Sequence, residues 1–318
     1  MKILVTGGAG FLGARLIEAL LAPTASDLLP PGASLVSVDL APCPIDDPRV
    51  VSHTGDICDP AFIQSLIGPE TSLVYHLAAI VSGQAEADFD LGMRVNFEAT
   101  RALLEACRHQ AQAPRFVFAS SLAVFGGPMP EQVPEELAPL PQSSYGAQKA
   151  MAELLINDYS RKGFIDGRVC RLPTISVRPG KPNAAASSFA SGILREPLAG
   201  EASNCPVPLD TRMWLSSPQT VVDNLVHAAR LDGQALGLRR TLNLPGISVR
   251  VSEMLDSLAR VGGEAARARV SFEPDERIQR IVCSWPGDFD IQRPLQLGFR
   301  GDADFDSVVR AHLLSMNH

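Results

Sequence analysis

Short apolar runs alternate with segments of helical periodicity through the first half of the chain. The apolar runs predict strands at residues 2–6, 34–39, 50–53, 72–77 and 115–119. Helical spacing of apolar residues fills the intervals, at residues 11–21, 61–67 and 86–110. Strands that alternate with helices pair in parallel through right-handed crossovers. The pattern therefore predicts an α/β fold built on a doubly wound parallel sheet.

The second half of the chain has a different pattern. Residues 178–191 and 201–211 are rich in Pro, Ser and Ala and follow neither period. Helical spacing returns at residues 218–231 and 251–261. We therefore expect a first domain at residues 1–175 and a smaller substrate-binding lobe at residues 176–318, interleaved with the last strands of the sheet.

The composition argues against several classes of protein. The 318 residues contain no apolar run of about 18 residues, so no membrane-spanning helix is expected. The N-terminus is unlike a signal peptide, and the six cysteines are scattered without a C-x-x-C spacing. We therefore expect a cytoplasmic protein with neither a metal site nor a disulfide framework. A net charge of -7 without any block of Lys and Arg argues against nucleic acid as a partner.

The strongest local signal lies between the first strand and the first helix, in Thr6-Gly7-Gly8-Ala9-Gly10-Phe11-Leu12-Gly13. Gly7 allows a tight turn, Gly10 lets the backbone approach a pyrophosphate at the helix N-terminus, and Gly13 allows close helix packing. Asp39 ends the second strand, where a carboxylate binds both ribose hydroxyls of NAD and repels the 2′-phosphate of NADP. These residues predict a Rossmann domain that prefers NAD to NADP. The alternative is a strand–turn–helix unit without a ligand.

Two further segments could line a bound adenosine. Asp56 and Ile57 follow the third strand, and the fourth strand ends in Leu77, Ala78 and Ala79. Small residues at a strand end let a cofactor pass close to the backbone. A helix cap and a packed strand end explain the same residues equally well.

Tyr145 and Lys149 open a predicted helix further along the chain. Residues four apart share a helix face, so the phenol and the ammonium group point the same way. A phenol with a pKa of about 10 is a poor base at neutral pH, and a neighbouring ammonium group lowers that pKa. The pair therefore predicts a general base, with a solvated surface pair as the alternative.

A serine completes the candidate catalytic group. Ser120 and Ser121 end the fifth strand, and α/β sheets bind ligands at the carboxyl ends of their strands. Ser121 could hydrogen-bond a reacting hydroxyl, and Ser120 is the alternative residue for that role.

The chain resembles the extended short-chain dehydrogenase/reductases, the group that includes nucleotide-sugar epimerases. The resemblance covers nearly the whole chain and is carried by TGGAGFLG, Asp39, GDI at 55–57, HLAA at 76–79, ASSLAVFG at 119–126, YGAQK at 145–149 and RLPTISVRPG at 171–180. It implies that Ser121 and Tyr145 activate a substrate hydroxyl and that Lys149 holds the nicotinamide ribose. Gln148 stands where serine is frequent and Phe125 where tyrosine is frequent, and neither change removes a reacting group.

The same resemblance implies roles for three more residues. Asn96 matches the helix asparagine that supports the active site, and Pro173 and Thr174 match the segment beside the nicotinamide. Proteins of this group often pair through a helix like the one that begins at Tyr145, so a homodimer is among the expected assemblies.

Within that group, residues 82–96, 178–193 and 284–290 resemble bacterial sugar-acid dehydrogenases that act on D-erythronate. This similarity implies NAD-dependent oxidation of D-erythronate at C2 to 2-oxo-tetronate. A sugar acid needs a cation for its carboxylate and polar groups for its hydroxyls. The candidate contacts are Ser82, Ser121, Arg178, Asn183 and Arg212, with Lys181, Ser187 and Ser188 on the same loops.

Several alternatives stay open. Each arginine could instead form a surface ion pair, and Trp285 is interpreted as core or interface packing rather than a substrate wall. The other functions considered are a nucleotide-sugar epimerase or dehydratase, another sugar-acid dehydrogenase of the uronate type, and a regulator that senses NAD. The presence of the Tyr–Lys pair counts against the regulator.

Overall fold

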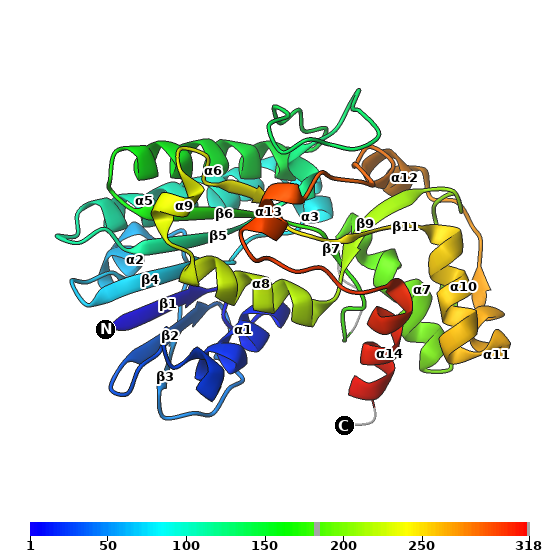
Figure 1. Cartoon of the computed structure of the whole chain (residues 1–318), viewed down its shortest axis with the longest axis horizontal. Helices are drawn as coiled ribbons and strands as arrows, with labels where there is room; N and C mark the ends of the chain where they lie inside the picture. The colour runs from blue at the N-terminus through cyan, green and yellow to red at the C-terminus, as the bar shows by residue number, and fades with distance from the viewer. Residues whose placement is uncertain (181–184, 317–318) are drawn as a thin grey trace.

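A parallel sheet of seven strands forms the centre of the protein (Figure 1). The computed structural model describes residues 1–180 and 185–316. The strand order is β10-β6-β5-β4-β1-β2-β3, and every neighbouring pair is parallel. The prediction of a doubly wound parallel sheet is confirmed. The strands are β1 (Lys2–Thr6), β2 (Ser34–Asp39), β3 (Val50–Thr54), β4 (Thr71–His76), β5 (Arg115–Ser121), β6 (Asp166–Leu172) and β10 (Thr241–Asn243).

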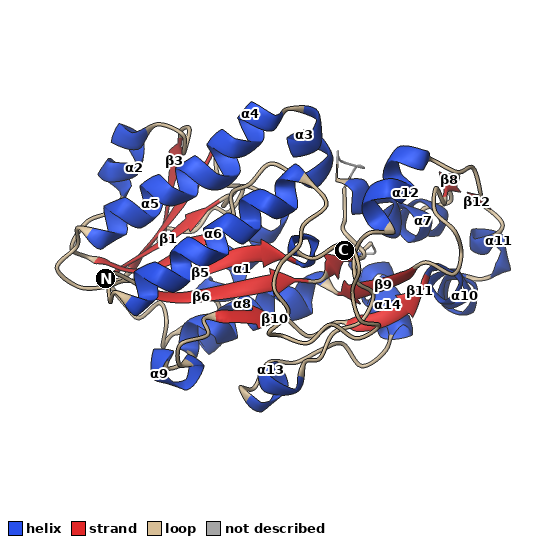
Figure 2. Ribbon diagram, turned by 90° about the horizontal axis from the view of Figure 1, so that it is seen from above, coloured by secondary structure: helices blue, strands red, loops and turns tan. Residues whose placement is uncertain are grey.

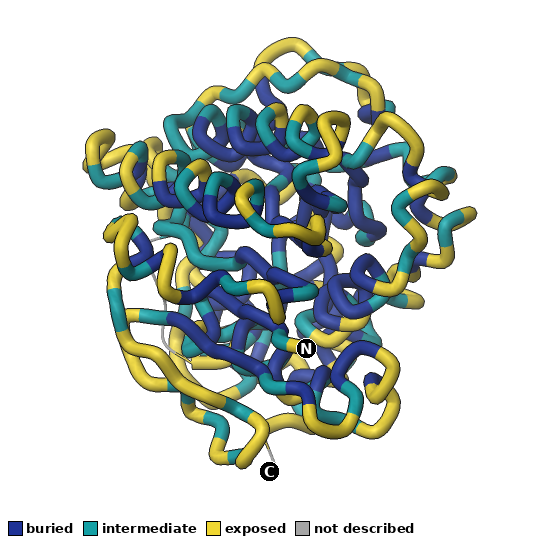
Figure 3. The backbone as a smooth tube through the Cα atoms, turned by 90° about the vertical axis from the view of Figure 1, so that its left-hand side faces the viewer, coloured by how far each residue is buried: buried dark blue, intermediate teal, exposed yellow. Residues whose placement is uncertain are grey.

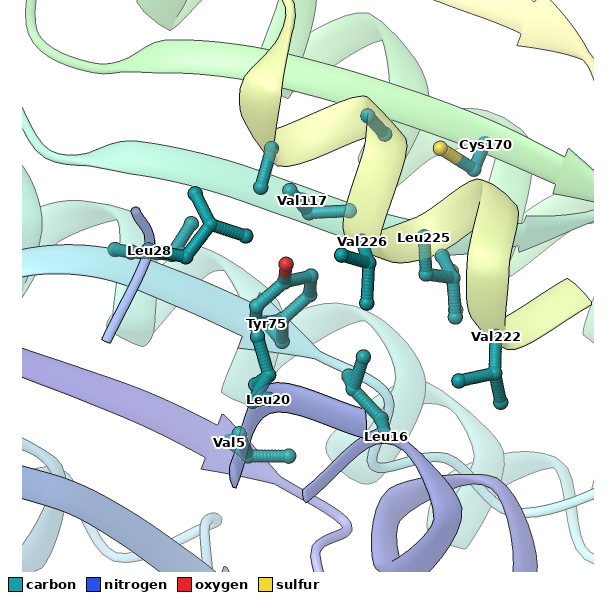
Figure 4. Close-up of a cluster of buried hydrophobic side chains, with 14 of the residues drawn as sticks. Val5, Leu16, Leu20, Leu28, Tyr75, Val117, Cys170, Val222, Leu225 and Val226 are labelled. Carbon is teal, nitrogen blue, oxygen red and sulfur yellow. The ribbon is translucent and has the colours of Figure 1, made fainter. Parts of the chain in front are cut away.

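Helices cover both faces of this sheet. Helices α1 (Phe11–Leu21) and α8 (Pro218–Arg230) pack on one face, and α2 (Pro60–Leu66), α5 (Ala99–Arg108) and α6 (Ser144–Arg161) pack on the other (Figure 2). Strand residues alternate between the two layers, since Ile3 and Val5 join the first cluster whereas Leu4 joins the second. Burial on both faces is the reason that these strands read as continuous apolar runs. Figure 4 shows the first cluster, in which α1 and α8 side chains surround Tyr75.

The prediction of one helix over residues 86–110 is wrong in its first part. The segment forms α3 (Ser82–Ala87), α4 (Phe89–Gly92), a π-helical turn (Met93–Glu98) and then α5. Asp88 breaks the helix, because its backbone is extended and its side chain accepts a hydrogen bond from the Leu91 amide at 2.9 Å. Asp88 therefore acts as the N-cap of the helix that follows it.

The remaining elements form a lobe beyond the carboxyl ends of the strands (Figure 2). Strand β9 (Arg212–Ser216) pairs with β11 (Ile247–Arg250) and with β7 (Thr174–Ile175), and helices α7 (Phe189–Leu198), α10 (Val251–Gly262) and α14 (Phe305–Ser315) enclose an apolar cluster. Smaller elements complete it: β8 (Ser203–Asn204), β12 (Val270–Ser271), α11 (Glu264–Arg267) and α12 (Glu276–Val282). Helix α9 (Gly233–Leu236) lies just before β10, which returns to the central sheet. Helix α13 (Gln292–Gln296) lies instead beside α9 and β10, where Arg293 donates to the Leu236 and Thr241 carbonyl oxygens. A boundary near residue 175 stays a prediction.

Buried backbone forms the centre of the molecule, and exposed backbone lies on the outer loops and helix faces (Figure 3). Within residues 1–180 and 185–316, no helix combines the length and the apolar character needed to cross a membrane. The same described residues hold no group of three or more His, Cys, Asp or Glu side chains arranged to bind a metal ion.

Candidate active site

One cavity of about 810 Å³ brings most of the predicted site residues together. Its wall contains residues from the strand ends of the sheet and from the segments that follow β7. Ligands of doubly wound sheets bind at this edge, where the strand order reverses. The predicted residues that line the cavity are Gly7, Gly10, Phe11, Leu12, Gly13, Asp39, Asp56, Ile57, Leu77, Ala78, Ala79, Ser82, Ser121, Tyr145, Lys149, Pro173, Thr174 and Arg178.

The glycine loop leaves space where side chains would collide with backbone. Gly7 has a φ of +74°, and a Cβ atom there would lie 2.8 Å from the Ala78 nitrogen. A Cβ atom at Gly13 would lie 2.0 Å from the Gly7 carbonyl oxygen. Helix α1 begins after Gly10 without a side-chain cap and without an acidic residue in its first turn. Its N-terminal amides are therefore available to an anion, and this loop fits the pyrophosphate of a dinucleotide.

Asp39 fixes the edge of the same loop. One of its carboxylate oxygens accepts a hydrogen bond from the Ala9 amide at 3.1 Å, and the other accepts one from the Leu40 amide at 2.7 Å. Each carboxylate oxygen has further lone pairs, so the group can also accept hydrogen bonds from a diol. Asp39 thus has a structural role that does not prevent it from binding a ribose.

Helix α6 positions Tyr145 and Lys149 against the end of β5. Ser143 caps this helix by accepting a hydrogen bond from the Gly146 amide at 3.2 Å. A Cβ atom at Gly146 would lie 2.1 Å from the Ala123 carbonyl oxygen, so glycine is needed for this close approach. The Lys149 Nζ atom donates to the Ala119 carbonyl oxygen at 2.9 Å and lies 5.8 Å from the centre of the Tyr145 ring.

Burial shifts the pKa values of Tyr145 and Lys149 so that the neutral form of each side chain is favoured. Burial raises the pKa of Tyr145 to about 12, and a hydrogen bond with Ser121 opposes that change. Burial lowers the pKa of Lys149 to about 7, and the charge of Glu153 opposes that change. The net pKa of Tyr145 is raised, because desolvation of the phenolate outweighs the hydrogen bond with Ser121. A base at Tyr145 therefore depends on nearby positive charge and on Ser121.

The two serines at the end of β5 have different partners. The Ser121 side chain accepts a hydrogen bond from the Ala123 amide at 3.1 Å and lies beside Tyr145. The Ser120 hydroxyl donates to Glu153 at 2.5 Å and is buried. This arrangement favours Ser121 over Ser120 as the serine that meets a substrate, since the Ser120 hydroxyl is already engaged.

A buried ion pair lies behind the Tyr–Lys pair. Tyr145, Lys149 and Glu153 follow one another at intervals of four along α6. The Glu153 carboxylate receives three hydrogen bonds from Arg171 on β6, at 2.7 to 3.1 Å, and both side chains are less than a tenth exposed. Asn243 on β10 also accepts a longer bond from Arg171, at 3.4 Å. Sequence patterns do not indicate this network, because its members are separated by 18 to 90 positions.

Asn96 lies behind the cavity wall rather than in its lining. Its side-chain oxygen accepts from the Ile80 amide at 2.9 Å, and its amide nitrogen donates to the Gln148 side chain at 2.8 Å. Asn96 thus ties the segment after β4 to helix α6, on which the Tyr–Lys pair stands.

The structure separates the predicted substrate contacts. Ser82 and Arg178 line the cavity, as does Trp285, which also packs against two apolar clusters. Arg212 is not in the lining: its guanidinium group lies 3.5 Å from Glu131 and 4.0 Å from Asp288. The guanidinium group of Arg212, at the start of β9, thus forms ion pairs with these two carboxylates. Ser187 and Ser188 line the cavity, whereas Asn183 and Lys181 lie outside the described residues.

Two arginines of the wall were missed by sequence analysis. Arg94 stands on the π-helical turn, and Arg195 stands on α7. The apolar positions of Phe189, Ile193 and Leu194 follow a helical period that predicts α7, but the surrounding segment was interpreted as irregular.

Comparison with known proteins identifies the relatives of the chain. Residues 3–215 match the NAD-dependent epimerase/dehydratase family. The chain is 54% identical to D-erythronate dehydrogenase of Cupriavidus necator and 51% identical to D-erythronate dehydrogenase of Haemophilus influenzae, with 98% of each chain covered in both cases. It is 40% identical to a solved structure, a nucleoside-diphosphate-sugar epimerase from Agrobacterium tumefaciens, with a TM-score of 0.92 over 99% of this chain and 94% of that chain. The resemblance to extended short-chain dehydrogenase/reductases is confirmed.

Proposed function

We propose that this chain, a member of the NAD-dependent epimerase/dehydratase family, oxidises D-erythronate at C2 to 2-oxo-tetronate. The family and the relatives show an oxidoreductase that uses a nicotinamide cofactor. The observation that carries the proposal is a single cavity that holds the glycine loop, the Ser121–Tyr145–Lys149 group and a half-buried arginine, Arg178. The two D-erythronate dehydrogenases named above support this choice of substrate.

The residues of the cavity fit a dinucleotide. The amides after Gly7 and Gly10 would bind the pyrophosphate, and Asp39 would bind the adenosine ribose. When bound, a nicotinamide supplies the acceptor for a hydride. A carboxylate at Asp39 repels a 2′-phosphate, so we propose that NAD is preferred to NADP.

Tyr145 acts as the general base in this proposal. Its phenolate takes the proton of the C2 hydroxyl while the C2 hydrogen leaves as hydride and the C2–O bond becomes a carbonyl. Ser121 donates a hydrogen bond to that oxygen, and the Lys149 ammonium group stabilises the phenolate electrostatically. Because burial holds the pKa of Lys149 near 7, the charge of Glu153 four residues further along helps to keep the lysine protonated.

The experiment supplies NAD or NADP with a panel of four- to six-carbon sugar acids and measures the reduced cofactor. We expect turnover of D-erythronate with NAD and a loss of about 100- to 10,000-fold in the Tyr145→Phe variant. Tyr159→Phe is the matched control, since that phenol lies on the same helix but donates to Glu105 outside the cavity lining. Full turnover by Tyr145→Phe would contradict the mechanism.

A second candidate is a nucleotide-sugar epimerase, which the similarity to the Agrobacterium tumefaciens protein favours. The same panel therefore includes UDP- and dTDP-sugars. Turnover of a nucleotide sugar without turnover of any sugar acid would replace the main proposal with this one.

A further inference from the structure

The guanidinium group of Arg178 carries a buried nitrogen that no described residue of the chain hydrogen-bonds. Arg178 follows β7 and lines the cavity, and its Nη2 atom is buried without a hydrogen-bond partner among the described residues. Burial and the neighbouring charge of Arg195 both lower the pKa of Arg178. A buried charge without a partner is costly. The structure therefore favours a ligand that brings the missing acceptor.

The backbone of Arg178 is held in place before any ligand binds. Its amide donates to the Ser191 hydroxyl at 3.0 Å, and the Arg195 side chain donates to its carbonyl oxygen at 2.7 Å. Ser191 and Arg195 both belong to α7, so one helix fixes this segment at two points. A preorganised group loses less entropy when it binds a ligand.

The local charge count favours an anion with a single charge. Arg178 and Arg195 carry two positive charges, and Glu196 pairs with Arg195 through a bond of 2.5 Å. Among these three described residues one positive charge stays unpaired, on the guanidinium group of Arg178. A carboxylate matches that charge and accepts the paired N–H donors of a guanidinium group in a bidentate manner.

Building on the proposed function, we propose that Arg178 binds the carboxylate of the substrate and that Arg195 is its positioning residue. The cavity then selects 2-hydroxy acids over neutral polyols of the same length. A nucleotide sugar would offer a phosphate to the same guanidinium group, so the test must separate carboxylate from phosphate.

The test compares D-erythronate with its neutral amide, D-erythronamide, in the wild type and in variants of Arg178, Arg195 and Arg161. For the wild type we expect kcat/KM to be about 10- to 100-fold higher with the acid than with the amide. Arg178→Gln should raise KM for the acid by a similar factor and leave KM for the amide nearly unchanged, which removes the preference. Arg195→Gln should weaken the same preference, and Arg195→Lys should restore part of it. Arg161→Gln is the control, since Arg161 is exposed and pairs with Asp158.

Each outcome bears on the proposal. If the wild type oxidises D-erythronate and Arg178→Gln keeps the full preference for the acid, the assignment is wrong while the proposed function stands. If Arg212→Gln, rather than Arg178→Gln, removes the preference for the acid, the assignment of Arg178 is also wrong. The assignment is likewise wrong if the wild type binds UDP tightly and Arg178→Gln alone abolishes that binding. Circular dichroism and Arg178→Lys, which keeps the charge and should retain part of the preference, exclude misfolding as the cause. If the wild type oxidises no sugar acid, both the function and this assignment fail.

Discussion

Arg171 and Arg178 lie seven residues apart on the chain, on either side of β7, yet their guanidinium groups have opposite surroundings. Arg171 is 6% exposed and is held by Glu153, by Asn243 and by the ring of Phe125, 4.6 Å from the guanidinium carbon. Arg178 stands in the cavity wall, and its buried Nη2 atom has no acceptor among the described residues.

This difference separates a structural charge from a charge that awaits a ligand. The ion pair of Arg171 is complete within the fold and supports helix α6, which carries Tyr145 and Lys149. The guanidinium group of Arg178 lacks such a partner among the described residues, and we propose that the substrate supplies it. Three measurements of the unfolding free energy test this difference between Arg171 and Arg178. Altering a side chain that has a partner should lower the unfolding free energy, whereas altering one that has no partner should not.

The largest effect is expected from Glu153→Gln. This change leaves the buried Arg171 without its counter-charge, and breaking a buried pair in this way costs about 3–5 kcal/mol of unfolding free energy. Urea denaturation followed by circular dichroism measures it. Asp158→Asn on the same helix breaks an exposed pair with Arg161 and should cost less than about 1 kcal/mol. Equal losses in the two variants would show that the pair with Arg171 is not a structural support.

An intermediate effect is expected from His76, which is partnered like Arg171 but uncharged. Its ring nitrogens lie 2.7 Å from the Thr6 hydroxyl and 2.8 Å from the Thr100 hydroxyl. Burial, followed by the charge of Lys149, lowers the pKa of His76 to about 3. The unfolded chain takes up this proton near its ordinary pKa of about 6.5, so stability falls as pH drops from there toward 3.

Between pH 6.5 and pH 5 the loss attributable to His76 is about 2 kcal/mol. The measurement is urea denaturation at a series of pH values for the wild type and for His76→Gln. The glutamine does not titrate, so the variant should lose less stability over this interval. Parallel curves for the two proteins would show that His76 is not held neutral in the folded state.

The smallest effect is expected from Arg178→Gln in the absence of ligand. Removing a half-buried charge that has no partner relieves desolvation, so we expect the unfolding free energy to stay constant or to rise by up to about 1 kcal/mol. Thermal denaturation monitors this change. A loss of more than about 2 kcal/mol, on the scale of a broken structural interaction, would mean that Arg178 already has an essential partner within the chain.

The sequence predicts the cofactor half of the cavity better than the substrate half. Gly7, Gly13 and Asp39 act through local backbone geometry, and Tyr145 and Lys149 act through helix spacing, so short motifs indicate all of them. The surroundings of Arg178 depend instead on where α7 packs, and a one-dimensional pattern does not show whether an arginine is paired. The same limit applies to Arg212, a predicted substrate contact whose guanidinium group lies near Glu131 and Asp288.

The break at Asp88 has a similar cause. Apolar spacing favours one helix over residues 86–110, but the side chain of Asp88 caps a new helix near the start of this range. Capping residues compete with helix continuation through local hydrogen bonds, and periodicity alone does not reveal which of them prevails.

The central claim is that the cavity removes a hydride from C2 of a sugar acid, and isotope transfer tests it most directly. The experiment incubates the protein with NAD and D-erythronate that carries deuterium at C2, and then determines the mass of the reduced cofactor. The account predicts deuterated NADH together with 2-oxo-tetronate. Unlabelled NADH, or deuterium that stays in the product, would contradict oxidation at C2.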